Sequence, residues 1–143
     1  MKRCWHLGLC ALQPSWFFQS DDNVLSWPVT LGTFYAKYKL ENVLDRNKSV
    51  VLSKMLVDTG SEYTWAPAQS LEKIGIDREK KDVPFVMANG QQITRSVGFA
   101  IIRLDKHFTV DEVVFAEKGD LLLLGARSLE GLNLRVIPVA GNL

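Results

Sequence analysis

The chain has 143 residues, of which 47% are hydrophobic, and its 17 basic and 16 acidic side chains give a net charge of +1. A chain of this length can bury one core of ordinary size but not two, so we expect a single domain. With no basic stripe and no polybasic run, nothing indicates nucleic acid or an anionic membrane as a partner, and a polypeptide partner is favoured.

Residues 1–30 show neither a strand period nor a helix period, and they contain Cys4 and Cys10. A basic start followed by an apolar stretch allows a secretory signal within residues 1–20, but the stretch is short and lacks a clean cleavage site. It is also too short to span a membrane. We therefore predict a poorly ordered extension. Because residues 29–143 lack cysteine, the core is compatible with a reducing cytoplasm.

An alternating pattern begins after Thr33 and has the period of a half-buried strand. Its apolar members are Phe34, Ala36, Tyr38 and Leu40. Polar turn residues follow at positions 45–48, and the apolar run 50–57 predicts a second strand.

The second strand ends in Asp58-Thr59-Gly60. An aspartic protease needs a carboxylate at the end of a strand, a small hydroxyl residue that fixes the loop, and a glycine where the backbone comes close to a partner. The tripeptide supplies all three in order. It also arises by chance, so its surroundings must support the interpretation.

A short helix is predicted after Pro67, with Leu71 and Ile74 on one face and Gly75 at its C-terminal cap. The charged residues 79–82 are expected to form a solvated loop.

Asn89-Gly90 lies between two runs that carry apolar residues, and it predicts the tip of a hairpin because both residues tolerate positive φ. Strands are expected over 97–104 and 108–115, with a turn near 105–106 between them.

The continuous apolar run 121–124 predicts a strand buried on both faces, and Gly125 and a short helical segment at 126–131 follow it. Trp65 is expected in the core. His107 is expected to be exposed on a turn, and no residues have the spacing of zinc ligands.

Three of these features resemble the retropepsin-like aspartic proteases, the single-lobed branch of the acid protease superfamily. They are the sequence D-T-G-S-x-x-x-W-x-P from Asp58 to Pro67, the apolar-apolar-glycine motif that ends at Gly125, and the hairpin between them. The resemblance covers residues 31–143 and implies an all-β protomer: a single, closed, barrel-like lobe with one or two short helices that works as a homodimer. Residues 1–30 fall outside it.

Because the chain carries a single Asp-Thr-Gly, the resemblance implies that Asp58 from each of two protomers forms the catalytic dyad of an endopeptidase. One carboxylate deprotonates a water that attacks the scissile carbonyl, and the other acts as the acid, without a metal or cofactor. Thr59 is expected to hydrogen-bond across the interface, Gly60 to admit the substrate backbone, and Ser61 to donate to the outer carboxylate oxygen of Asp58.

The resemblance further implies that the hairpin is a flap that closes over a bound peptide. The residues expected to contact substrate are Ser61, Glu62, Met87, Asn89, Gly90, Gln91 and Leu124. Glu62 matches an acidic position that pairs with an arginine directly after the apolar-glycine motif, but here Arg127 stands one place later, which weakens that expectation. The C-terminal stretch 136–143 is expected to add strand pairing to the dimer interface.

Two other classes of protein share features of this sequence. The turn also resembles the phosphate-binding turn of sugar kinases and actin-like ATPases, but those folds need two large α/β domains. The stronger alternative is a protease-like domain that no longer cleaves and serves as a dimerising or peptide-binding module.

Overall fold

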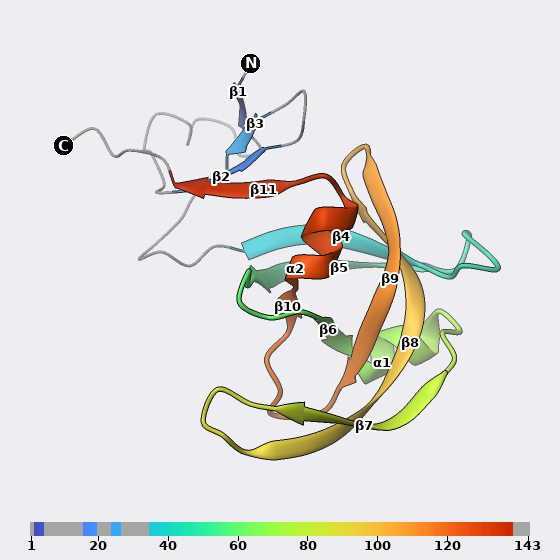
Figure 1. Ribbon diagram of the computed structural model, residues 1–143. Helices are drawn as coiled ribbons and strands as arrows, with labels where there is room; N and C mark the ends of the chain where they lie inside the picture. The colour runs from blue at the N-terminus through green and yellow to red at the C-terminus, as the bar shows by residue number, and fades with distance from the viewer. Residues whose placement is uncertain (1, 5–15, 20–23, 27–34, 139–143) are drawn as a thin grey trace.

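The computed structural model describes residues 2–4, 16–19, 24–26 and 35–138, and strands dominate it (Figure 1). The strands are β1 (Lys2–Cys4), β2 (Trp16–Gln19), β3 (Val24–Ser26), β4 (Tyr35–Glu41), β5 (Ser49–Val57), β6 (Thr64–Pro67), β7 (Lys80–Val86), β8 (Gln92–Leu104), β9 (His107–Ala116), β10 (Leu123–Leu124) and β11 (Arg135–Pro138). The helices are α1 (Ala68–Lys73) and α2 (Ala126–Gly131). No helix in these ranges is long and apolar enough to cross a membrane.

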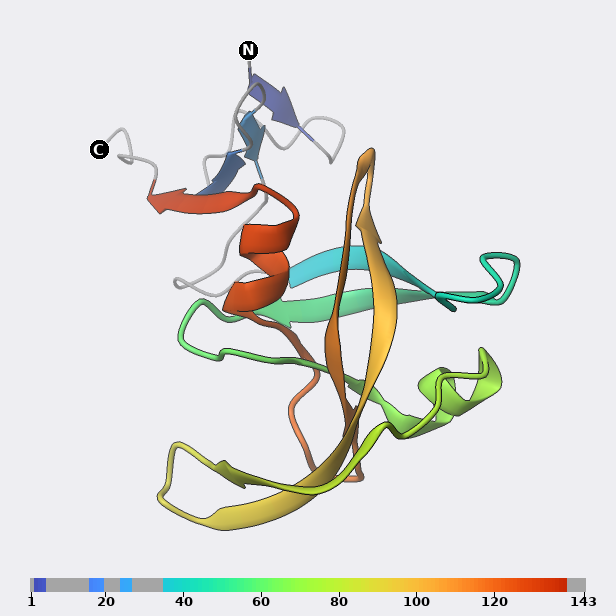
Figure 2. The ribbon, with the colours of Figure 1, turned by 45° about the vertical axis from the view of Figure 1, so that its right-hand side comes forward.

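The larger sheet has the strand order β4-β5-β10-β6-β9-β8-β7, and β4 also pairs with β8. Six strands therefore form a ring, and β7 lies outside it, paired only with β8. In Figures 1 and 2, β7 and the beginning of β8 project from the ring as a hairpin. The predicted single all-β lobe with two short helices is confirmed.

The ring is filled by the inward faces of its strands. Ala36, Tyr38 and Leu40 are buried at every second position of β4, as the alternating pattern predicts, and they pack with Met55 and Val57 of β5. Phe34, the first member of that pattern, lies outside the described residues.

Helix α1 begins after Pro67 and ends as the sequence predicts. Gly75 has φ +76°, its N–H donates to the Glu72 carbonyl at 3.0 Å, and the Ile76 N–H donates to the Leu71 carbonyl at 3.0 Å. This pair of bonds is a Schellman motif, which explains why a glycine stands at the end of the helix.

The charged segment at 79–82 is not a loop throughout, because β7 begins at Lys80. Its side chains are exposed as expected, but the pairing with β8 shifts register between Lys80 and Val83. Asp82 has φ +54° at this irregularity, so a bulge carries the polar residues into the strand.

The hairpin tip is one residue longer than predicted. The Met87 carbonyl accepts from the Gly90 N–H at 2.8 Å, and the Met87 N–H donates to the Gln91 carbonyl at 2.8 Å. Within the tip only Gly90 has positive φ, at +83°. The loop is therefore a turn followed by a glycine bulge, and not a two-residue Asn-Gly turn.

Two further expectations are wrong. The apolar run at 121–124 forms only the two-residue strand β10, and Leu121 is 62% exposed. His107 does not lie on a turn but begins β9, is half-buried, and its Nε2 has no hydrogen-bond partner among the described residues.

The strands β1, β2, β3 and β11 form a smaller sheet with the order β1-β3-β2-β11 (Figure 1). No period in the sequence predicted β1, β2 or β3. Strand β11, expected at a dimer interface, pairs antiparallel with β2 of the same chain. Residues 139–143, the rest of that predicted interface segment, lie outside the described residues, as do residues 27–34 around the predicted domain boundary.

Candidate active site

Asp58 follows the last residue of β5 and is fixed by main-chain hydrogen bonds. Its N–H donates to the Leu124 carbonyl at 3.0 Å, and its carbonyl accepts from the Ser61 N–H at 3.3 Å. The carboxylate oxygen Oδ1 accepts from the Gly60 N–H at 2.9 Å. Thr59 and Gly60 are exposed, so the turn presents its outer edge to solvent.

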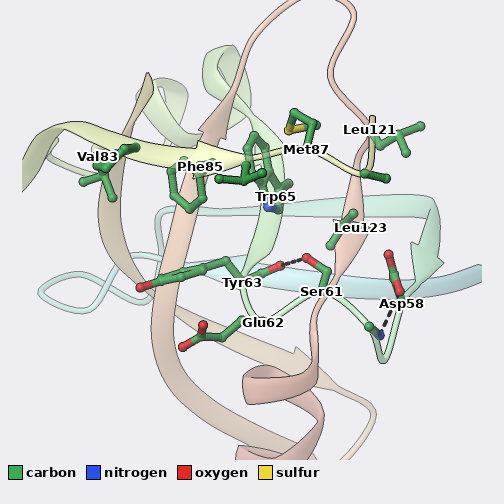
Figure 3. Close-up of a pocket in the computed structure, with 14 residues that line it drawn as sticks. Asp58, Ser61, Glu62, Tyr63, Trp65, Val83, Phe85, Met87, Leu121 and Leu123 are labelled. Atoms are coloured by element: carbon green, nitrogen blue, oxygen red, sulfur yellow. Dashed lines mark hydrogen bonds between the residues drawn. The ribbon is translucent and has the colours of Figure 1, made fainter. Parts of the chain in front are cut away.

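The Ser61 hydroxyl does not donate to Asp58, and that prediction is wrong for this chain. Ser61 Oγ donates to the Tyr63 carbonyl at 3.2 Å (Figure 3). The hydroxyl closes the turn that follows Asp58, and the main-chain N–H of Gly60 takes its expected place at the carboxylate.

The first turn of α2 packs on the loop that follows Asp58. The N–H groups of Ala126 and Arg127 donate to the carbonyls of Ser61 at 2.7 Å and Glu62 at 3.2 Å. No side chain caps α2, so these carbonyls satisfy the free amides that every helix start exposes. The start of α2 therefore supports the loop after Asp58 through two main-chain hydrogen bonds.

A buried chain of hydrogen bonds connects α2, β6 and β9 behind the turn. The Gly125 N–H donates to Thr64 Oγ1 at 3.0 Å, Thr64 Oγ1 lies 2.5 Å from Ser128 Oγ, and Ser128 Oγ donates to Asp111 Oδ2 at 2.8 Å. Because Ser128 uses its single hydroxyl proton for Asp111, Thr64 must donate to Ser128. No motif in the sequence predicted this network; the available signal was the pair of acidic residues, Asp111 and Glu112, directly before the apolar half of β9.

Glu62 and Arg127 lie close together, but their pair is loose. Their nearest charged atoms are 3.9 Å apart, and the Glu62 side chain is 68% exposed, so the pair contributes little to stability. Arg127 lies nearer to Glu112, at 3.0 Å. Hydrogen bonds from Lys80 and Arg127 hold the pKa of Glu112 below its usual range, and Arg127 Nη2 also lies 3.5 Å from Asp111 Oδ1.

A cavity of about 510 Å³ begins at Asp58 and continues beside the β7–β8 hairpin. Its aromatic wall consists of Phe85 from β7, packed edge-on against Tyr63 (5.4 Å between ring centroids) and Trp65 (5.0 Å) (Figure 3). Trp65 is 6% exposed, as its core assignment predicts. Other side chains that line the cavity are Val83, Met87, Leu121 and Leu123.

Some of the residues expected to contact substrate line the cavity, and others lie outside its lining. Ser61, Glu62 and Met87 line the cavity. Asn89, Gly90 and Gln91 are exposed at the hairpin tip and outside the cavity lining.

Leu124 is fully buried in the core and does not line the cavity. Because side chains alternate along a strand, its neighbour Leu123 faces the cavity instead. Leu121, two positions earlier, also lines it. Because residues 121–124 are all leucine, no alternation in the sequence shows which of them face the cavity.

The described residues contain no group of three or more His, Cys, Asp or Glu side chains that could hold a metal ion.

A strand-borne Asp-Thr-Gly turn in a single all-β lobe, next to a cavity, is the arrangement of a retropepsin-like aspartic protease. The model of the family described as gag-polyprotein putative aspartyl protease matches residues 47–131. That match covers more than half of the chain, and the chain belongs to this family. No curated protein matches the chain.

Proposed function

We propose that the protein is an aspartic endopeptidase whose active site contains Asp58 from each of two protomers. The family match supports an aspartyl protease in general. The observation that carries the proposal is the position of Asp58 at one end of a mainly apolar cavity large enough for peptide side chains.

In this proposal the exposed edge of the turn, with Thr59 and Gly60, meets the same edge of a second protomer. The two Asp58 carboxylates would then face each other and could not both be ionised, so they would share one proton. The ionised Asp58 takes a proton from water, which attacks the scissile carbonyl carbon, while the protonated Asp58 donates to the carbonyl oxygen. In the resulting gem-diol, the Asp58 that took the water proton passes a proton to the amide nitrogen, and the other Asp58 takes a proton from a hydroxyl group. The C–N bond then breaks, which releases an amine and a carboxylic acid and restores the shared proton.

The β7–β8 hairpin would act as the flap. Its inner side chains Phe85 and Met87 already line the cavity. The exposed residues at its tip, 89–91, would reach the peptide only when the hairpin closes, which would exclude water from the reacting bond.

The direct test is cleavage of a mixed peptide library by the full chain, with and without a statine-type transition-state analogue. Asp58→Asn should reduce cleavage by about a thousandfold or more while fold and association are kept, because an amide cannot share the proton. Asp77→Asn, a change of an exposed aspartate after α1, is the matched control and should cleave normally.

Cleavage that survives in Asp58→Asn would refute the aspartic mechanism. If the unaltered chain associates and binds the statine compound but cleaves no peptide, the protein is the silent peptide-binding module instead.

A further inference from the structure

Arg95 and Asp120 form a forked ion pair beside the cavity. Arg95 Nε lies 2.7 Å from Asp120 Oδ2, and Nη2 lies 2.9 Å from Oδ1. Both side chains are largely buried, at 16% and 8% exposure. Asp120 Oδ2 also accepts from the Glu117 N–H at 2.8 Å, which holds the carboxylate in a fixed orientation. A pair with this geometry is stronger and more directional than an ordinary surface ion pair.

The pair lies where the hairpin leaves the sheet. The ladder between β8 and β9 ends at Val97, opposite Val114. Beyond it, residues 92–96 of β8 pair only with β7. We call β7, the hairpin tip and residues 92–96 of β8 the β7–β8 arm. A two-stranded ribbon is marginally stable by itself in water, so this arm needs other contacts to keep its position.

On one side the arm is held by Phe85, which packs on Tyr63 and Trp65. On β8 it is held by Arg95, which stands opposite Val83 in the ladder. Asp120 directly precedes Leu121 in the chain, and both Val83 and Leu121 line the cavity. The ion pair therefore connects the arm to the loop that carries another wall of the cavity.

We propose that Arg95 and Asp120 are positioning residues that fix the β7–β8 arm relative to the loop at 117–122 and so set the affinity of the cavity for a peptide. The affinity part of this inference rests on the proposed function, and the positioning part does not. Arg95 also holds the pKa of Asp120 below its usual range, so the pair stays charged in mildly acidic solution.

The first experiment measures amide hydrogen exchange in the full chain and needs no activity. Arg95→Gln should speed exchange of the arm amides at 85–93 by about tenfold, because the arm opens more often. Arg95→Lys, which keeps the charge but loses the fork, should give a smaller increase. Arg103→Gln is the matched control: it removes a forked pair with Glu41 on β4 at the opposite end of β8 from the arm, and should leave arm exchange unchanged.

The second experiment separates KM from kcat for a cleaved peptide. Arg95→Gln and Asp120→Asn should each raise KM about tenfold with kcat within about twofold. The double variant should raise KM by much less than the roughly hundredfold expected of two independent effects, because the two side chains share one ion pair. Unchanged arm exchange in Arg95→Gln would overturn the proposal whether or not the protein cleaves peptides. Equal effects of Arg95→Gln and Arg103→Gln on arm exchange would also overturn it, because both variants would then act through general destabilisation. If the unaltered chain shows no cleavage, the proposed function fails and the exchange data still decide the positioning role.

Discussion

A glycine is required at position 125 because a side chain would not fit there, and not because the backbone conformation favours glycine. Its φ of −89° and ψ of 174° are open to any residue. A Cβ at this position, however, would lie 2.4 Å from the Tyr63 carbonyl oxygen and 2.9 Å from that of Glu62. The glycine of the apolar-glycine motif is therefore the point where α2 comes close enough to support the loop after Asp58.

We expect Gly125→Ala to lower the free energy of unfolding by about 3 kcal/mol, because main-chain atoms cannot move aside as a flexible side chain can. Urea unfolding would measure the change. Gly119→Ala is the control: nothing lies within 4 Å of its Cβ position, and its φ of +95° predicts a smaller loss of about 1 kcal/mol. A smaller loss at position 125 than at 119 would contradict the steric argument.

At the scale of single elements, β5 contains a bulge three residues before the end of the strand. The pairing with β4 shifts register, so that Ser53 and Lys54 stand opposite a single residue, Lys37. Lys54 has φ +57°, a left-handed conformation that residues with a Cβ rarely adopt. The bulge bends the strand just before it delivers Asp58.

In a regular strand Val is favoured over Gly, and we expect the opposite order at position 54 of this bulge. Lys54→Gly should leave stability unchanged or raise it by up to about 1 kcal/mol, and Lys54→Val should lower it by about 2 kcal/mol, because a β-branched residue is strained at positive φ. At Val51, an exposed position in the regular part of β5, Val51→Gly should destabilise as in any strand. Thermal unfolding of the three variants tests the prediction, and a Lys54→Val protein as stable as Lys54→Gly would contradict it.

At the scale of the whole molecule, the proposed mechanism needs a second copy of the chain. The exposed edge of the Asp58 turn supplies a contact surface. In the described part of the chain, β11 is an edge strand of the smaller sheet, so one of its edges is available to pair with a strand of a second copy.

Specific activity should therefore fall on dilution as dimers dissociate, and sedimentation should show the same midpoint. Two copies joined in tandem by a flexible linker should keep their activity at the same dilution, because association is then intramolecular. A monomer with constant specific activity would refute the two-protomer site.

Acid should destabilise the folded chain through its paired carboxylates. Arg103 holds the pKa of Glu41 below its usual range, as Lys80 does for Glu112 and Arg95 does for Asp120. A folded pKa below the unfolded value gives stability that is complete above the unfolded pKa and is lost as the pH falls through the folded pKa. The free energy of unfolding should be level from pH 7 to about pH 5 and fall below about pH 4.

Glu41→Gln should lower the free energy of unfolding at pH 7 by about 2 kcal/mol, because the Arg103 hydrogen bonds to a charged group are weakened. It should also lose less stability between pH 5 and pH 3 than the unaltered chain does. Urea unfolding over this pH range measures both effects, and an equal acid loss in the two proteins would show that Glu41 is not linked to the pH dependence.

Sequence alone determined the features that depend on near neighbours. The alternation in β4, the Gly75 cap of α1, the bounds of α2 and the Asp-Thr-Gly turn at the end of β5 were all readable, because each depends on the conformation of a few consecutive residues. The order of the Asp-Thr-Gly turn, the hairpin and the apolar-glycine motif carried the family resemblance, and that resemblance implied the all-β lobe.

Tertiary structure decided which distant groups meet. The preference of Arg127 for Glu112, the choice of Leu123 over Leu124 for the cavity wall and the Arg95–Asp120 pair all depend on how strands are ordered in the ring. Single-residue bulges change that register, and a shift of one residue turns every later side chain to the opposite face. The partners of a polar side chain therefore become known only when the sheet is closed.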